Sequence, residues 1–265
     1  MQLYKKFLVK PEFDSLDDFL QNFKIEIPAN FNFSYDVIDE YARIEPNKIA
    51  LVWVDDQGEH IDLTYADLKE KTDATASYFQ TQGIGRGDKV MLILKRRYEF
   101  WFACLALHKI GAVAIPATHL LTDKDIIYRC NAATIKAIVC VGEETVLQAI
   151  DKAMPACPSV EKTISTGPVI PEGWGNFQQG INEAPAFVKP KLPSENDDLL
   201  FLYFTSGTTG NPKMVAHDYT YPLAHIITAS FWHNVEENGR HLTVADTGWA
   251  KAVWGKMYGQ MLAGC

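Results

Sequence analysis

The stretch LLFLYFTSGTTGNPKMV, residues 199–215, decides how this chain folds and where it binds a ligand. Its apolar first part, ending at Phe204, predicts a buried strand. Small hydroxyl residues, glycines and Lys213 follow at once. If the strand belongs to a parallel sheet, these residues lie at the carboxyl edge of the sheet, where open α/β sheets bind their ligands.

The loop after this strand has the composition of a phosphate-binding loop. Gly207 and Gly210 allow backbone N–H groups to approach an anion, and Lys213 supplies positive charge. The hydroxyl residues are Thr205, Ser206, Thr208 and Thr209. An exposed turn is the alternative, because Gly, Ser and Thr are common turn residues. Three features together favour a phosphate-binding loop over an exposed turn: the preceding strand, the adjacent hydroxyls and the lysine.

Two familiar phosphate-binding patterns do not fit this loop. In the P-loop pattern counted from Gly207, Pro212 stands at the second glycine position and Met214 follows the lysine. The dinucleotide pattern G-x-G-x-x-G fails here and again at residues 83–88, which we interpret as a turn.

Apolar runs alternate with helical patterns over residues 49–154. Strands are expected at 49–54, 90–94, 112–116 and 137–141, and helices from Thr64, at 98–110, from Thr122 and at 143–154. This alternation predicts an α/β fold, a mostly parallel sheet flanked by helices on both faces. Residues 1–30 are expected to form an N-terminal extension. Recurring prolines make residues 155–198 a loop-rich connection in this interpretation.

Composition and charge exclude several classes of protein. The formal net charge of −8 on 265 residues disfavours nucleic acid as a partner. No apolar run approaches the ~20 residues that span a bilayer, and residues 1–10 lack the apolar core of a signal peptide. The five cysteines are scattered, which indicates reduced thiols and a cytoplasmic location rather than a disulfide or zinc framework. No metal site built from the chain's own side chains is expected.

Four motifs resemble the adenylate-forming superfamily, which includes acyl-CoA synthetases, luciferases and peptide-synthetase adenylation domains. Residues 205–213, Thr-Ser-Gly-Thr-Thr-Gly-Asn-Pro-Lys, look like its phosphate-loop signature without a mismatch. Residues 111–116 (GAVAIP), 122–129 (TDKDIIYR) and 245–251 (ADTGWAK) resemble three further motifs. The last is most like the medium-chain acyl-CoA synthetases. The resemblance runs from about Phe33 to Cys265.

The resemblance implies a two-step reaction. A carboxylic acid attacks the α-phosphate of ATP, which arrives with Mg²⁺, to give an acyl-adenylate; coenzyme A then displaces AMP. Lys213 is the expected catalytic residue, and the expected nucleotide-binding residues are Thr205, Ser206, Gly207, Thr208, Thr209, Gly210, Asn211, Pro212 and Lys213. Trp249 and Trp254 would line the acyl pocket, although core packing is an equally simple role for them. The sequence does not determine the acyl chain length, the acceptor thiol or the oligomeric state.

The resemblance also implies that the chain is an N-terminal fragment of a ligase. The superfamily's Tyr-Gly-x-Thr-Glu motif is missing, because Met261 and Leu262 follow Tyr258-Gly259-Gln260 where Thr-Glu is expected. Residues 31–265 would then be a partial AMP-binding domain, with a first sheet layer at about 31–190 and a phosphate-loop region at 191–265. The C-terminal domain would be absent and the fragment alone inactive.

Two other functions compete with the acyl-CoA synthetase. The chain could come from an adenylating enzyme whose acceptor is a carrier-protein thiol, or it could be a nucleotide-binding module without catalysis. His217 and His225, near the loop, are interpreted as structural because no serine or cysteine pairs with them in a triad. The basic run Lys95-Arg96-Arg97 is interpreted as a solvated strand end rather than a contact to coenzyme A.

Overall fold

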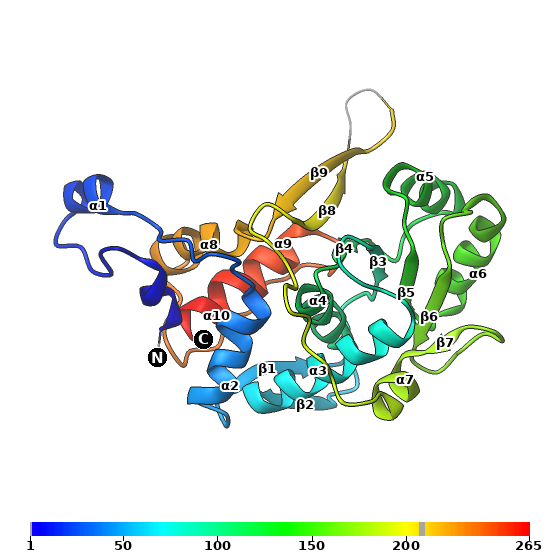
Figure 1. Cartoon of the computed structure of the whole chain (residues 1–265), viewed down its shortest axis with the longest axis horizontal. Coiled ribbons are helices and arrows are strands. Elements are labelled where there is room, and N and C mark those ends of the chain that lie inside the picture. The colour runs from blue at the N-terminus through cyan, green and yellow to red at the C-terminus, as the bar shows by residue number, and fades with distance from the viewer. Residues whose placement is uncertain (1, 207–209) are drawn as a thin grey trace.

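A seven-stranded sheet forms the centre of the molecule (Figure 1). The computed structural model describes residues 2–206 and 210–265. The strand order is β7-β6-β5-β3-β4-β8-β9, parallel throughout except for the antiparallel pair β8–β9. The strands are β3 (Lys89–Ile93), β4 (Val113–Pro116), β5 (Ala137–Val141), β6 (Lys162–Thr166), β7 (Gly175–Asn176), β8 (Leu199–Thr205) and β9 (Lys213–Asp218).

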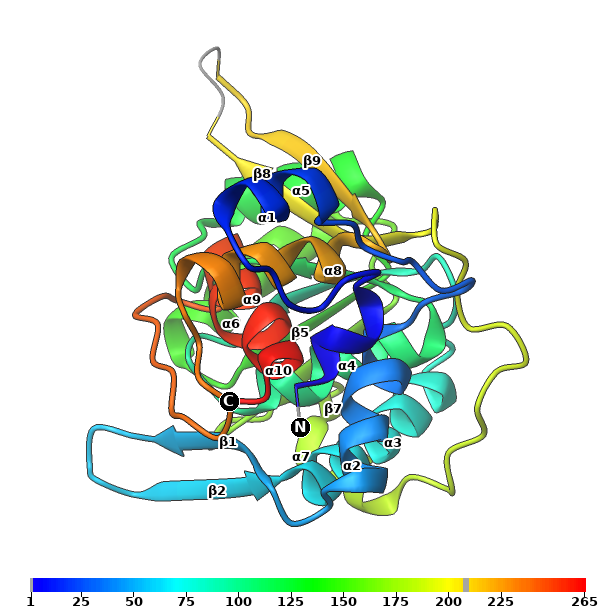
Figure 2. The same ribbon diagram turned by 90° about the vertical axis from the view of Figure 1, so that its left-hand side faces the viewer.

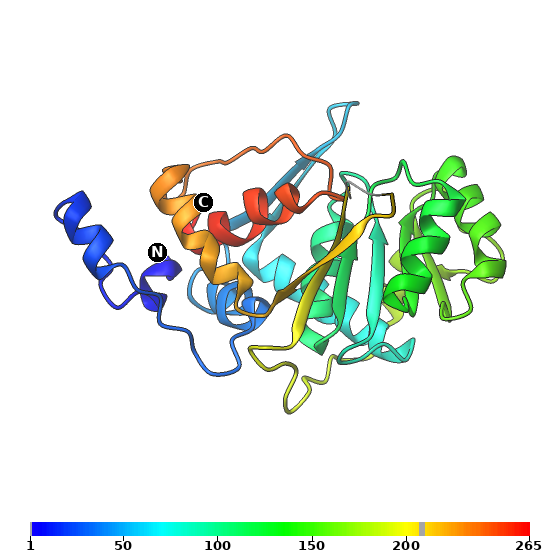
Figure 3. The same ribbon diagram turned by 90° about the horizontal axis from the view of Figure 1, so that it is seen from above.

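Both faces of the sheet are covered, which explains why its central strands are apolar without alternation. Val90 and Leu92 of β3 point into one core, while Met91 and Ile93 point into the other. Helices α3 (Tyr65–Thr81), α4 (Glu99–Ile110) and α7 (Phe177–Glu183) pack in the first core, and α5 (Asp123–Ala133) and α6 (Glu144–Ala153) in the second. Figure 3 shows helices on both sides of the sheet. The expected α/β fold is confirmed.

Local capping signals fix where the main helices begin and end. Thr64 and Thr122 each form a capping box with the aspartate three residues later, Asp67 and Asp125. Gly111 ends α4 with a φ of 75°, and a Cβ there would lie 1.9 Å from the carbonyl oxygen of Pro193. A side chain at this position would therefore clash as well as strain the backbone.

Two parts of the chain differ from the sequence-based expectation. Strand β1 (Ile49–Val54) does not join the parallel sheet but pairs with β2 (His60–Thr64) in a separate antiparallel ribbon. The proline-rich stretch 155–198 contains β6 and β7 as well as loops. Strand β6 was missed because Lys-Thr-Ile-Ser-Thr has a single strongly apolar residue, Ile164; its buried hydroxyls Ser165 and Thr166 bond to Val169 and Glu99 instead.

The C-terminal helices and the N-terminal segment pack beside the sheet on the side of α4 (Figure 2). After β9 come α8 (Tyr221–Ile226) and the π-helical η4 (Ile227–Trp232). A last helix combines α9 (Ala250–Val253), the π-helical η5 (Trp254–Tyr258) and α10 (Gly259–Ala263). The N-terminal elements are η1 (Leu3–Phe7), α1 (Leu16–Asn22), η2 (Ser34–Asp39) and α2 (Glu40–Ile44); η3 (Met154–Ala156) follows α6.

Within the N-terminal extension, residues 13–23 attach to the rest of the chain through aromatic rings. Phe13, Phe19 and Phe23 surround Phe231 of η4, with ring centroids 5.0–5.9 Å from it. The division of residues 31–265 near residue 190 stays a prediction, and β8 and β9 lie in the same sheet as β3–β6. No helix in the described part of the chain is long and apolar enough to cross a membrane.

Candidate functional site

The described ends of the phosphate loop, residues 205–206 and 210–213, lie at the far end of the β8–β9 hairpin, which projects beyond the sheet (Figure 1). Strand β8 runs parallel to β4, so its last residues stand at the carboxyl edge, as predicted. Thr205 is paired across the hairpin with Lys213, which brings a hydroxyl and an ammonium group to the same end. Residues 207–209, the centre of the expected loop, are outside the described residues.

The described ends of this loop are open to solvent and carry unopposed positive charge. Thr205, Ser206, Gly210, Asn211 and Lys213 are exposed, and Pro212 is half-buried. Within the part of the chain that the structure describes, Lys213 forms no ion pair. Gly210 has a φ of 115°, a conformation that side-chain-bearing residues rarely adopt. An exposed lysine beside hydroxyl groups and a glycine without a side chain fits an anionic ligand such as a polyphosphate.

Helix α5 braces this hairpin, a role that sequence reasoning missed. The Tyr128 hydroxyl donates a hydrogen bond of 2.9 Å to the carbonyl oxygen of Pro212, one residue before Lys213. The Tyr128 ring also meets Phe204 of β8 edge-on, and the Arg129 guanidinium lies 5.2 Å from the centre of the Phe204 ring. The motif at 122–129 could have indicated this contact. Thr122 and Asp125 cap the start of α5, and Tyr128 and Arg129, one turn later, contact Pro212 and Phe204 at the ends of the loop.

The motif at 245–251 packs against the end of β4. The backbone N–H of Gly248 donates to Asp246 Oδ1 at 2.9 Å, and His119 Nδ1 lies 3.5 Å from Asp246 Oδ2. A Cβ on Gly248 would lie 2.3 Å from the backbone nitrogen of Thr118. The motif therefore needs glycine at 248 to reach the carboxyl edge of the sheet, near the end of β4.

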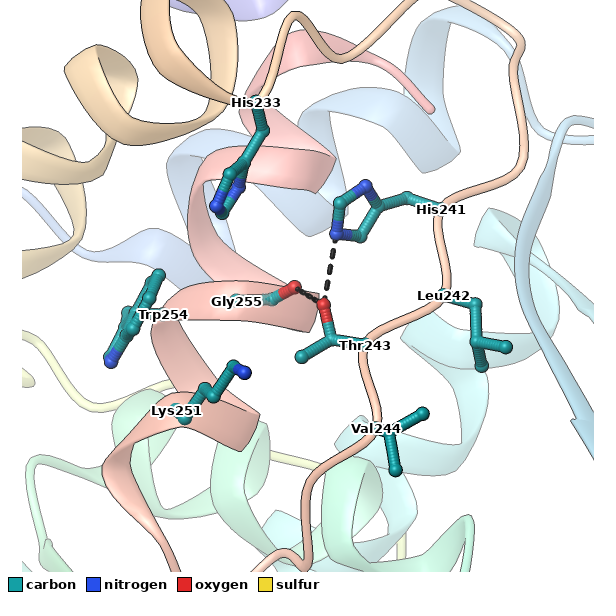
Figure 4. Close-up of a pocket in the computed structure, with 8 residues that line it drawn as sticks. All are labelled: His233, His241, Leu242, Thr243, Val244, Lys251, Trp254 and Gly255. Atoms are coloured by element: carbon teal, nitrogen blue, oxygen red, sulfur yellow. Dashed lines mark hydrogen bonds between the residues drawn. The ribbon is translucent and has the colours of Figure 1, made fainter.

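A pocket opens between the extended segment 241–244 and the last helix (Figure 4). Trp254 lines it, together with Lys251 and Gly255 on the helix and His233 at the end of η4. Trp249 does not line it: this residue stands at the N-cap position of α9, and its side chain is 64% exposed. The structure thus separates the two tryptophans, and their acyl-binding role stays a prediction.

The other residues considered from the sequence have local partners. Tyr221 packs between His217 and His225, with ring centroids 4.0 and 4.6 Å away. Burial lowers the pKa of His217, and it lowers the pKa of His225 to about 4, so both rings are neutral near pH 7. In the basic run, Lys95 pairs with Glu143 and Arg97 with the buried Glu99.

The described residues contain no cluster of histidine, cysteine, aspartate or glutamate that could hold a metal ion. Cys104, Cys130, Cys140 and Cys157 are buried and Cys265 is half-buried, all as free thiols.

Comparison with known proteins gives the family. The model of a family described as AMP-binding enzyme matches residues 38–265. The chain is 31% identical to acyl-coenzyme A synthetase ACSM3, mitochondrial, of Mus musculus, over 97% of this chain and 45% of that protein. It is 32% identical to acyl-coenzyme A synthetase ACSM4, mitochondrial, of Mus musculus, over 94% of this chain and 44% of the relative.

A solved structure agrees on the fold. The anthranilate CoA ligase AuaEII in complex with anthranoyl-AMP superimposes with a TM-score of 0.77 at 20% identity, over 90% of this chain and 45% of that one. The chain thus spans less than half the length of these proteins, as an N-terminal part of such an enzyme would. Because the family model matches most of the chain, this chain belongs to the AMP-binding enzyme family.

Proposed function

We propose that this chain is the N-terminal part of an AMP-forming acid–CoA ligase. The observation that carries the proposal is the β8–β9 hairpin, which presents Thr205 and Lys213 side by side at the carboxyl edge of a parallel sheet; no described residue forms an ion pair with Lys213. Family membership and the names of the acyl-coenzyme A synthetases that it resembles support the same function. The substrates are a carboxylic acid, Mg-ATP and coenzyme A.

The first step joins the acid to AMP. A carboxylate oxygen attacks the α-phosphorus of ATP and the bond to pyrophosphate breaks, so negative charge grows on the departing phosphates. Lys213 and the hydroxyls at 205–206 stabilise that charge, the kind of electrostatic stabilisation that dominates phosphoryl chemistry. The backbone N–H of Gly210 would supply a further donor. Tyr128 holds the carbonyl of Pro212 and so limits the positions that Lys213 can take.

In the second step the coenzyme A thiol attacks the acyl carbon, loses its proton and displaces AMP. The pyrophosphate contacts have no part in it. We further propose that the acid is of short to medium chain length and that Trp254 forms part of its pocket. The relatives carry mitochondrial names, so they give no support to the cytoplasmic location expected from the sequence.

ATP–pyrophosphate exchange in the full-length protein tests the function. We expect exchange only when a carboxylic acid is present, and thioester formation only when coenzyme A is also added. Transfer to a carrier-protein thiol but not to coenzyme A would favour the alternative acceptor. Nucleotide binding without exchange for any acid would refute the ligase and leave a binding module.

A further inference from the structure

His119 stands in the link between two elements that contact the phosphate-loop hairpin. The link, residues 117–122, runs from the end of β4 to the start of α5. Strand β4 pairs with β8, and α5 contacts the same hairpin through the hydrogen bond from Tyr128 to the carbonyl oxygen of Pro212. His119 is therefore held at the base of the hairpin by elements on both sides of it in the chain.

The strand register gives the level of this link at the sheet edge. Ala114 of β4 is paired with Phe201 of β8, and both strands run in the same direction. Counting four residues along each chain brings Thr118 to about the level of Thr205, the first residue of the phosphate loop. His119, the next residue, thus comes to the carboxyl edge of the sheet where the loop begins.

Asp246, in the motif at the end of β4, faces His119. The Nδ1 atom of His119 lies 3.5 Å from Asp246 Oδ2, while Asp246 Oδ1 accepts the backbone N–H of Gly248 at 2.9 Å. The neighbouring backbone is fixed in turn by Lys256, whose ammonium group donates to the carbonyl oxygen of Ala245 at 2.8 Å. An aspartate held in this way can orient an imidazole ring beside it.

The two ring nitrogens of His119 have different surroundings. Nδ1 is buried and forms no hydrogen bond with a described residue, so the Asp246 carboxylate 3.5 Å away is an acceptor that a small movement would bring into range. Catalytic hydrogen bonds are often long without substrate and shorten in the complex. The side chain is 26% exposed, and no described residue bonds to Nε2. A proton fixed on Nδ1 leaves Nε2 with its lone pair.

The charged groups near this pair belong to the last helix and to the turn after β3. Burial lowers the pKa of Lys256, the charge of Asp246 raises it, and the charge of Arg96 lowers it. A carboxylate beside a histidine stabilises the imidazolium that forms when the ring takes up a proton. Asp246 and His119 thus have the arrangement of an aspartate–histidine pair that accepts a proton.

We infer that His119 is the general base of the second step and that Asp246 is its positioning residue. The inference rests on the proposed ligase function. His119 Nε2 takes the proton of the coenzyme A thiol as the sulfur bonds to the acyl carbon. The bond from that carbon to the phosphate oxygen breaks, AMP leaves with the electron pair, and the imidazolium then releases its proton to water. A thiol of ordinary pKa is only about 3% ionised at pH 7, so the base makes the nucleophile available.

The two half-reactions of the full-length protein test the inference. ATP–pyrophosphate exchange identifies an acid that the enzyme activates, and the preformed adenylate of that acid then measures thioester formation alone. His119→Gln should leave exchange within about twofold and slow thioester formation at pH 7 by roughly 10- to 30-fold, because only the ~3% of thiol already ionised still reacts. His60→Gln, at an exposed position of β2, is the matched control and should change neither.

The pH dependence distinguishes a base from a residue that only supports the fold. Between pH 7 and pH 9.5 the free thiol ionises by itself, from about 3% to about 90%, so the deficit of His119→Gln relative to the wild type should shrink to about twofold.

Asp246→Asn should show the same pattern with a nearly unchanged melting temperature. Its amide oxygen can still accept from Gly248, but its NH2 group cannot accept from His119 Nδ1. If His119→Gln fails to fold, this variant carries the test alone.

Three outcomes would overturn the inference and leave the ligase intact. A deficit in thioester formation that is constant with pH would mean that His119 does not take the proton. Equal loss of both half-reactions with a lower melting temperature would make the pair structural. An unchanged rate would remove both residues from the reaction. Absence of exchange with every acid would instead reject the ligase, and the base with it.

Discussion

The central strands and the β8–β9 hairpin belong to one sheet but differ in what surrounds them. Every residue of β4 and β5 is buried, whereas most of β9 is exposed, including Met214 and Val215. The first region can only support packing, because water and ligands do not reach it. The second contributes little packing but holds the charged and hydroxyl groups. Buried packing residues and exposed polar groups thus lie in different parts of the same sheet.

Two lysines illustrate the difference between the buried core and the exposed hairpin. Lys109, at the end of α4, is fully buried and its Nζ lies 2.7 Å from Asp39 Oδ1 while also bonding Asp73. Lys213 is exposed and has no ion pair among the described residues. Removing the first should destabilise the fold, whereas removing the second should slow adenylation and leave stability unchanged.

Lys109→Met is expected to have the largest effect. It leaves two carboxylates without their buried cation, and breaking a buried pair in this way costs about 3–5 kcal/mol. Urea unfolding, followed by circular dichroism, measures the loss. Lys191→Met, at an exposed position, is the control. If the free energy of unfolding fell by less than about 1 kcal/mol, the ion pairs of Lys109 would be solvated, and the contrast between Lys109 and Lys213 would be wrong.

Lys213→Ala should slow adenylation and leave stability unchanged. The barrier should rise by about 2–4 kcal/mol, a loss of roughly 30- to 1000-fold in ATP–pyrophosphate exchange; the loss should be partial because the hydroxyls at 205–206 remain. A preformed acyl-adenylate should still be converted to the thioester at a near-normal rate. Equal loss of both half-reactions would show that Lys213 does not act on the pyrophosphate.

His108 should make the core sensitive to acid. It is fully buried, its Nε2 lies 3.2 Å from the Tyr258 hydroxyl, and burial lowers its pKa to about 3. Because the folded-state pKa lies below the unfolded value, its contribution is complete above the unfolded pKa and is lost as pH falls toward the folded one. The loss should reach about 2 kcal/mol between pH 7 and pH 5.

The measurement is urea unfolding at several pH values, compared with His108→Gln, which cannot titrate. The variant is expected to be less stable at neutral pH but to lose less on acidification. Parallel pH profiles for the two proteins would remove His108 as the cause.

Tyr128→Phe should have the smallest effect. It deletes the hydrogen bond to the carbonyl of Pro212 and keeps the ring against Phe204, so the hairpin loses about 0.5–1.5 kcal/mol of stabilisation. We expect KM for ATP to rise a few-fold and the melting temperature to fall by no more than a few degrees. An unchanged KM would show that the hairpin holds its shape without α5.

Most of the fold could be predicted because its signals are local. Apolar runs marked β3, β4, β5 and β8, capping boxes marked α3 and α5, and Gly111 marked the end of α4. Strand β6 could not be found this way, since its hydroxyl residues are buried only through bonds made by the folded chain. The pairing of β1 with β2 outside the main sheet could not be predicted either, because an apolar run indicates a strand but does not show which strand it pairs with.

The sequence alone determined the order of elements, the position of the phosphate-loop signature after β8 and the resemblance that gave the family. These depend on neighbouring residues and need no knowledge of packing. Only the tertiary structure decided that Lys109 is buried, that Tyr128 contacts Pro212 across 84 residues, and that Trp254 lines a pocket while Trp249 does not. Such contacts depend on how helices pack against the sheet, and the packing is the sum of many weak interactions that no short stretch of sequence contains.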